Sequence, residues 1–138
     1  MLKGIDTSAV KYYNLLSASE LLGGGSGTAY DLSKGTHATL ILSCGSTAAA
    51  VVTGDMLRSS ASNGTFHNFG ASVSAAITDT VHVRSFTLGS SDVWYKLYHT
   101  ATGAGSPSVA AVLAVAGQRV TPVDQESDVT SYSVINEA

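Results

Sequence analysis

The sequence predicts an all-β fold, an antiparallel β-sandwich or jelly roll of about seven or eight strands with a short N-terminal arm or helix. Three observations predict it. Apolar and polar residues alternate with a period of two in repeated segments after Thr28, as in half-buried strands. Short segments rich in Gly, Ser, Asn and Asp separate these stretches at the spacing of a sandwich. No long helical pattern lies between them, which disfavours a parallel βαβ arrangement.

The composition suits strands and excludes several classes of partner. The chain has 138 residues, the size of one domain, and only 12% of them are charged, whereas it contains 20 Ser and 14 Thr. A helical bundle, whose solvent-exposed helix faces are charged, would need more Glu, Lys and Arg. The net charge is −3 and the 7 Lys and Arg residues are scattered, so we expect no nucleic-acid partner. No apolar run is as long as a membrane span, so we expect no membrane contact and synthesis in the cytoplasm.

Residues 1–24 are predicted to form an N-terminal arm. Val10, Tyr13 and Leu16 fall loosely at helical spacing, and a glycine-rich run then interrupts the pattern. A short helix within residues 8–22 and an extended arm are both compatible with this pattern. Either one could pack on its own domain or dock on a neighbouring subunit.

Residues 25–123 are predicted to form the sandwich, and residues 124–138 a polar tail. In the strand expected at residues 36–44, one face carries the apolar set that ends at Cys44. A strand follows at 51–59, where Gly54 suggests a bulge, and Asn63-Gly64 then suggests a hairpin turn with positive φ. The remaining strands are expected at residues 65–69, 73–77, 80–88, 93–100 and 109–116, with a possible edge at 119–123. The predicted core residues are Leu40, Leu42, Val83, Leu97, Leu113 and Val115.

No arrangement of residues predicts catalysis, a cofactor or a metal. The four histidines lie in four separate strands, and the acidic residues lie in separate turns. Cys44 lies on the apolar side of its strand without a neighbouring base, so we expect a buried thiol and not a nucleophile. The glycine-rich run 23–27 lacks the Lys-Ser/Thr ending of a phosphate-binding loop. We therefore expect that the chain is not an enzyme.

One aromatic strand supplies the candidate contact residues. Alternation places Trp94, Lys96 and Tyr98 on one face, while the residues between them face the opposite way. An exposed aromatic pair could stack on a sugar, anchor a subunit or simply cap the edge of the sandwich. The full set of candidate partner or glycan contacts is Trp94, Lys96, Tyr98, Tyr12 and Tyr13.

The order of five segments resembles a known family. They are a small-residue loop with an Asp-Leu strand (25–32), an Ala-Leu-rich strand (37–42), a Ser-rich hairpin (58–66), an aromatic strand (94–98) and a Val/Ala-rich strand closing on Gly-Gln-Arg-Val-Thr-Pro-Val (109–123). This order resembles the small β-sandwich virion proteins of tailed bacteriophages and prophages, over roughly residues 25–123. Asn63-Gly64 stands where the hairpin of that family commonly has Asp-Gly.

The resemblance implies a non-enzymatic structural protein of the phage virion. The expected role is a capsid decoration or cement protein that stabilises the shell by bridging capsid subunits. Its partners would be the major capsid protein and further copies of itself, and its location would be the virion. Two alternatives remain, a head-tail junction or tail component, and a carbohydrate-binding module on the virion.

Overall fold

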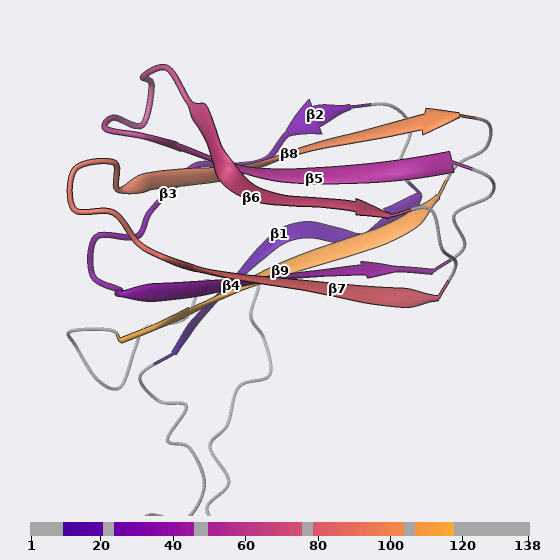
Figure 1. The fold of residues 1–138 in the computed structure, drawn as a ribbon, viewed down its shortest axis with the longest axis horizontal. Helices are drawn as coiled ribbons and strands as arrows, with labels where there is room; N and C mark the ends of the chain where they lie inside the picture. Colours follow the sequence, from indigo (N-terminus) through magenta and orange to yellow (C-terminus); the bar gives the residue numbers. More distant parts are fainter. Residues whose placement is uncertain (1–9, 21–23, 46–49, 76–78, 104–106, 118–138) are drawn as a thin grey trace, which may run out of the picture.

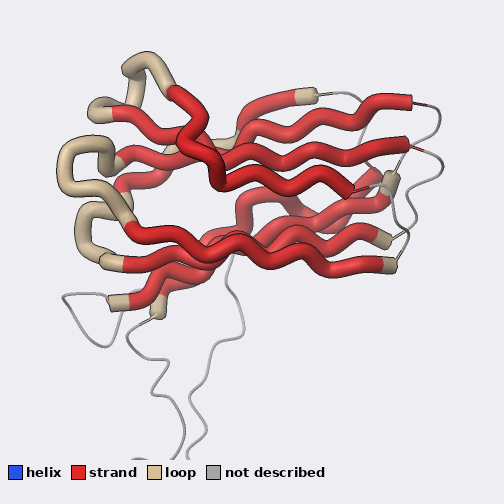
Figure 2. Tube along the Cα trace, viewed as in Figure 1, coloured by secondary structure: helices blue, strands red, loops and turns tan. Residues whose placement is uncertain are grey.

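The computed structural model describes residues 10–20, 24–45, 50–75, 79–103 and 107–117. Within these residues there are nine strands and no helix. The strands form two antiparallel sheets that face each other (Figures 1 and 2), so the predicted all-β sandwich is confirmed. The strands are β1 (Lys11–Glu20), β2 (Gly25–Ser26), β3 (Tyr30–Asp31), β4 (His37–Cys44), β5 (Ala50–Ser59), β6 (His67–Ala75), β7 (Thr80–Thr87), β8 (Trp94–Gly103) and β9 (Ser108–Ala116).

The strand order is that of one long hairpin rolled over itself. Sheet A has the order β1-β9-β4-β7, and sheet B has the order β2-β8-β5-β6, with β3 also paired to β8. β5 pairs with β6, β4 with β7, β2 and β3 with β8, and β1 with β9, so each pair encloses the previous one in the sequence. Because β2 and β3 share one edge of β8, they count as one interrupted strand. Eight strand positions nested in this way form a jelly roll.

The core lies between the sheets, at the inward-facing positions of the central strands. Along β4 and β9 every second residue is buried, as strand geometry requires when one face meets the opposite sheet. Cys44 is buried at the end of β4, as predicted. Five of the six predicted core residues are also buried, and these are Leu40, Leu42, Leu97, Leu113 and Val115.

The sixth, Val83, is exposed, so that prediction is wrong. Val83 lies opposite Ile41, while its neighbour His82 lies opposite the buried Leu42. The even-numbered residues of β7 therefore face the interior, although several of them are polar. β7 is an edge strand, where polar inward-facing side chains stay partly accessible and discourage pairing with another sheet. The alternation in β7 can be seen in the sequence, but which of its two sets of alternate residues faces the core cannot.

The N-terminal segment is a strand, so the prediction of a helix within residues 8–22 is wrong. β1 pairs with β9 and buries Tyr13 and Leu15, which are two residues apart. Strand period and the β propensity of tyrosine therefore outweigh the loose helical spacing. Residues 11–20 therefore form a strand of the sandwich, which the sequence analysis had placed in an arm that precedes it.

Two glycines have roles that differ from the predicted ones. The sequence suggested two strands at residues 65–69 and 73–77, but β6 is one continuous strand. Gly70, with a φ of 98°, lies at a local register shift within it, and the strand accommodates this shift because glycine adopts positive φ easily. Gly54, where a bulge was expected, is regularly paired. A Cβ atom at Gly54 would lie 3.1 Å from Cδ1 of Leu42, so this glycine permits close approach of the two sheets.

The connection between β5 and β6 confirms the predicted hairpin but changes its turn. The Gly64 N–H donates to the carbonyl oxygen of Ala61 at 3.1 Å. Neither Asn63 nor Gly64 has positive φ, so the turn is not the primed type that Asn-Gly suggests. The predicted edge strand at 119–123 and the predicted tail at 124–138 lie outside the described residues.

Candidate functional site

The aromatic strand β8 presents three of the predicted contact residues on the outer face of sheet B. Tyr95 and Leu97 are buried, whereas Trp94, Lys96 and Tyr98 point outward, so the predicted alternation is confirmed. Tyr98 is the most accessible of the three, with 39% of its surface exposed. Trp94 and Lys96 are half-buried. This face can therefore offer one open aromatic ring and not a pair.

Polar residues surround Tyr98 on sheet B. Asp55 of β5 and Ser26 of β2 lie directly opposite it on the two flanking strands. The next outward residue along β8, Lys96, places its Nζ atom 4.3 Å from the centre of the Phe66 ring, so a phenyl ring occupies part of the space beside the ammonium group. The outer face of sheet B is consequently polar and carries charges of both signs.

Tyr12 and Tyr13 point to opposite sides of sheet A. Tyr12 lies opposite Ala114 and faces outward, whereas Tyr13 lies opposite the buried Leu113. Tyr13 is only 4% exposed, and its ring packs against Tyr30 with a centroid distance of 4.6 Å. Tyr13 is therefore a core residue, and its prediction as a surface contact is wrong.

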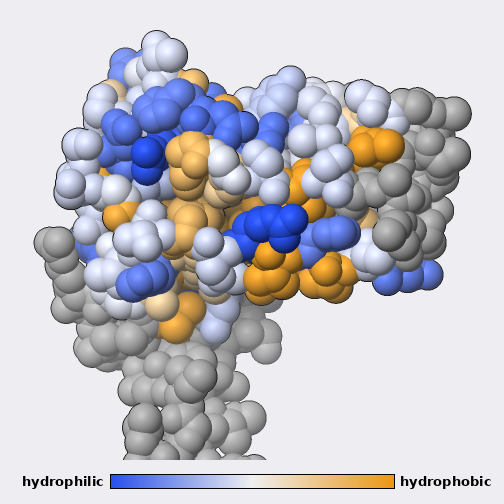
Figure 3. Space-filling model, in the orientation of Figure 1, coloured by the Kyte–Doolittle hydropathy of each residue, from blue (hydrophilic) through white to orange (hydrophobic). Residues whose placement is uncertain are grey.

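The outer face of sheet A is apolar, and sequence analysis missed it. Val81 and Val83 are 62% and 49% exposed, and Val112 is 37% exposed. The register places Ile41 directly between Val83 and Val112, so three strands contribute to one apolar row. Figure 3 shows hydrophobic residues at the surface on the side where β7 lies in Figure 1.

The outward-facing positions of β4, β7 and β9 around the apolar row carry no Asp, Glu, Lys or Arg. Small hydroxyl and alanine side chains surround the apolar row, and the hydroxyls of Thr39 and Ser85 bond to each other at 3.0 Å. Fewer ions would have to be desolvated when a partner covers this face than when one covers sheet B. The outward-facing residues of these three strands are His37, Thr39, Ile41, Ser43, Val81, Val83, Ser85, Thr87, Ser108, Ala110, Val112, Ala114 and Ala116, and Tyr12 and Asn14 of β1 lie beside them.

An aromatic cluster fills the open side of the sandwich between β6 and β7. The Phe69 ring meets Phe86 at 5.2 Å and Tyr95 at 5.7 Å, in edge-to-face geometry that favours aromatic packing. The Arg58 guanidinium lies 4.7 Å from the centre of the Phe69 ring, and its Nε is 3.8 Å from the Asp92 carboxylate. These contacts tie the β7–β8 connection to β5, which is a structural role.

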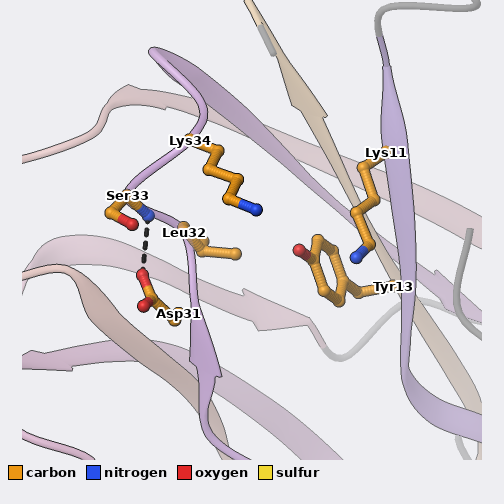
Figure 4. Close-up of a pocket in the computed structure, with 6 residues that line it drawn as sticks. All are labelled: Lys11, Tyr13, Asp31, Leu32, Ser33 and Lys34. Carbon is orange, nitrogen blue, oxygen red and sulfur yellow. Dashed lines mark hydrogen bonds between the residues drawn. The ribbon is translucent and has the colours of Figure 1, made fainter. Parts of the chain in front are cut away.

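A cavity of about 200 Å³ lies where β1 begins and the chain turns from β3 into β4 (Figure 4). Leu32 and Tyr13 form its apolar wall, while two lysines, Lys11 and Lys34, extend toward it. The Lys11 ammonium lies 5.3 Å from the centre of the Tyr13 ring. The remaining lining residues are Asp31 and Ser33, joined by a hydrogen bond of 2.9 Å from the Ser33 N–H to the carboxylate.

A second, wider hollow lies beside this cavity and has a volume of about 520 Å³. His37 is its one lining residue with a titratable side chain, and its Nδ1 lies 3.0 Å from the hydroxyl of Thr36. The other lining residues are small, apolar or hydroxyl-bearing, with no carboxylate, ammonium or thiol that could serve as a catalytic partner. The hollow therefore offers no catalytic pair.

The titratable groups inside the sandwich do not form a reactive centre. Burial raises the pKa of the Cys44 thiol, which lowers its thiolate fraction and its reactivity. Burial lowers the pKa of His99, whose Nδ1 is enclosed without a hydrogen-bond partner. Among the described residues, no three His, Cys, Asp or Glu side chains gather closely enough to hold a metal ion.

Comparison with known proteins adds no family to this description. No protein-family model matches the chain, and no curated protein matches it. Within the described residues, no helix is long and apolar enough to cross a membrane. The resemblance to phage virion proteins therefore stays a prediction.

Proposed function

We propose that this protein is a non-enzymatic structural protein of a phage virion, and that it decorates the capsid and clamps neighbouring capsid subunits. The observation that carries the proposal is the outer face of β4, β7 and β9, which has no Asp, Glu, Lys or Arg and leaves Val81, Val83 and Val112 exposed. Exposed large hydrophobic side chains that gather on one face typically mark a protein contact. The order of segments that resembles virion sandwiches supports the same role.

The physical basis of such a role is linkage. A protein that binds the assembled shell, but not its separated subunits, stabilises the shell by its binding free energy at every site. Individually weak contacts suffice because they are repeated over a lattice. The apolar row of sheet A can supply such a contact, since burying apolar surface contributes about 25 cal/mol per Å².

The first test is the position and effect of the protein in the particle. Electron cryo-microscopy of intact virions should place it on the capsid surface, and particles lacking it should release DNA at a lower temperature. A location confined to the portal or tail, or unchanged heat resistance, would contradict the cement role and favour the head-tail alternative.

A matched pair of variants tests the face itself. Val83→Lys puts a charge into the apolar row of the edge strand β7 and should weaken binding to particles that lack the protein by at least tenfold. Ser74→Lys puts the same charge on the edge strand β6 of sheet B and should bind normally. Equal binding by the two variants would contradict docking through sheet A.

A carbohydrate-binding role is the second candidate, because Tyr98 is exposed with Asp55 and Ser26 beside it. Sugar rings stack on aromatic faces while carboxylates and hydroxyls accept their hydrogen bonds. Tyr98→Ala distinguishes the two candidates. It should leave capsid binding intact under the first proposal and abolish glycan binding under the second.

A further inference from the structure

The tip of the β5–β6 hairpin carries an Asn-Gly pair in an open position. The hairpin connection lies at one end of the sandwich, beyond the paired residues of sheet B (Figures 1 and 2). Asn63 and Gly64 are both exposed there. An Asn side-chain amide and the backbone nitrogen of the next residue are the two groups that react when a succinimide ring forms. The surroundings of these two groups therefore determine how easily the ring closes.

The side chain of Asn63 is free to move toward its neighbour. It makes no hydrogen bond with any residue that the structure describes. Asn68, which is also exposed, provides a contrast on β6. Its Nδ2 donates to the Ser72 hydroxyl at 3.4 Å, and its Oδ1 accepts the Gly70 N–H at 2.7 Å. Asn68 is thus held at both ends of its amide, whereas Asn63 is not.

The packing of the turn requires glycine at position 64. A Cβ atom there would lie 2.6 Å from Oγ of Ser59 and 3.3 Å from the carbonyl oxygen of Ala61. Ser59 is only 2% exposed, and its hydroxyl accepts the Ala61 N–H at 3.3 Å, so it has little room to move away. Because glycine has no side chain, its nitrogen is unshielded and its backbone has wide conformational freedom. The fold therefore places the least hindered nitrogen directly after an exposed asparagine.

One hydrogen bond restrains the attacking nitrogen. The Gly64 N–H donates to the carbonyl oxygen of Ala61 at 3.1 Å, and it must leave this acceptor before the nitrogen can turn toward Asn63. The net strength of such a bond slows the step by only about 2- to 10-fold. The hydrogen bonds of residues 60–66 with other described residues are confined to the hairpin. The tip can therefore open without breaking the ladder between β5 and β6.

The reaction at this turn needs only water. A base removes the N–H proton of Gly64, and the nitrogen attacks Cγ of Asn63 to form a new C–N bond. The side-chain nitrogen takes up a proton and leaves as ammonia, which completes the succinimide. Water then adds to one of the two ring carbonyls and reopens the ring. The products are aspartate and isoaspartate, and no atom is oxidised or reduced.

We propose that Asn63 is a site of spontaneous deamidation in the folded protein, in which the Gly64 nitrogen displaces the side-chain amide and water leaves a carboxylate at the hairpin tip. The product adds a negative charge to a chain whose net charge is −3. In the isoaspartate form, the main chain also passes through the former side chain. The site belongs to the hairpin of sheet B and not to the apolar row of sheet A, so it does not depend on the proposed function.

Peptide mapping of the full chain tests the proposal with an internal control. Trypsin, which cleaves after Lys and Arg, leaves Asn63 and Asn68 in the same peptide, because no Lys or Arg lies between Arg58 and Arg84. After incubation of the folded protein at mildly alkaline pH, mass spectrometry should show deamidation at Asn63 at least about tenfold faster than at Asn68. The Asn63 rate should rise in proportion to hydroxide concentration, since the deprotonated nitrogen attacks. Equal rates at the two positions would overturn the proposal.

The same measurement in urea tests the weak restraint of the turn. The folded protein should deamidate at Asn63 no more than about tenfold more slowly than the unfolded chain, as one hydrogen bond allows. Protection of more than about a hundredfold would mean that the fold holds the hairpin tip closed, and would overturn reaction in the folded state.

A matched pair of variants connects the chemistry to the charge. Asn63→Gln moves the amide one methylene farther from the nitrogen and should slow the appearance of an acidic form in isoelectric focusing by about tenfold or more. Asn68→Gln should leave that rate unchanged, and Asn63→Asp marks where the product focuses. An acidic form that accumulates equally fast in Asn63→Gln would contradict the proposal. The wild-type peptide map decides the question if a variant fails to fold.

Discussion

Leu40 and Val83 lie on adjacent strands of sheet A and face opposite ways. Leu40 is fully buried, whereas Val83 faces outward. Leu40→Ala should lower the free energy of unfolding by roughly 2–5 kcal/mol, because it leaves a cavity in a closed core. Val83→Ala should change it by less than about 0.5 kcal/mol. Urea unfolding of the two variants measures the difference, and a similar loss in both would mean that β7 has the opposite phase.

His99 makes the stability depend on pH. It faces inward on β8, opposite Gly54 and Gly25, and burial lowers its pKa in the folded state. The unfolded state therefore binds more protons below a pH of about 6.5, so stability falls as the pH drops from 7.5 toward 5.

Urea unfolding at several pH values tests this dependence. His99→Gln should show a shallower loss of stability between pH 7.5 and pH 5 than the wild type. If His99→Gln has the same slope as the wild type, the pH dependence arises from other groups.

The alternation of Trp94, Lys96 and Tyr98 could be predicted because backbone pleating alone determines it. Their accessibility could not be predicted in the same way. Phe66, in a loop 30 residues earlier, packs beside Lys96, and such a contact leaves no local pattern in the sequence. Tyr12 and Tyr13 show the same limit, since the pairing of β1 with β9 decides which of the two faces the core.

Among the elements, β1 is the strand for which the structure differs most from the prediction. Deleting residues 1–22 removes β1, takes Tyr13 and Leu15 out of the core and uncovers one edge of β9. We expect this deletion to unfold the sandwich or lower its melting temperature by more than about 10 °C, since losing Tyr13 alone should cost roughly 2–5 kcal/mol. Circular dichroism on heating measures the change.

Deletion of residues 1–9 is the matched control, because it keeps β1 complete, and it should lower the melting temperature by less than the longer deletion does. If the longer deletion melts like the wild type, β1 contributes nothing to the stability of the domain.

Strands with strong alternation could be located closely from the sequence. The strands predicted at 36–44 and 80–88 correspond to β4 and β7. β2 and β3 could not be located, because each has only two residues and depends on pairing with β8. The break predicted within β6 corresponds to a register shift at Gly70, where the pairing with β5 is locally interrupted but resumes on both sides.

At the scale of the whole molecule, the two outer faces differ in chemistry. Sheet B presents Asp55 and Lys96, whereas sheet A presents Val112, Ile41 and Val83 in one row. These three apolar residues come from strands that are far apart in the sequence. Their proximity depends on register, so the candidate docking face could not be predicted from local patterns.

The free edges of both sheets are poor templates for a further strand. β1 has two register shifts and β6 one, while β2 and β3 are short. On β7, Arg84 reaches across to the carbonyl oxygen of Ser72 on β6, at 3.2 Å. Such features disfavour association through sheet edges. Contacts with other subunits are therefore expected through a face.

The nesting of the strand pairs also determines the order in which the sandwich can fold. Arg58 and His67 pair across a short connection, whereas Lys11 pairs with Val115. The entropy lost on closing a loop grows with its length, so we expect the β5–β6 hairpin to form first and β1 to dock last. Such non-local pairing typically slows folding to milliseconds or seconds. During synthesis, β1 leaves the ribosome first but must wait for β9, and in that interval Tyr13 and Leu15 are open to β9 of another copy.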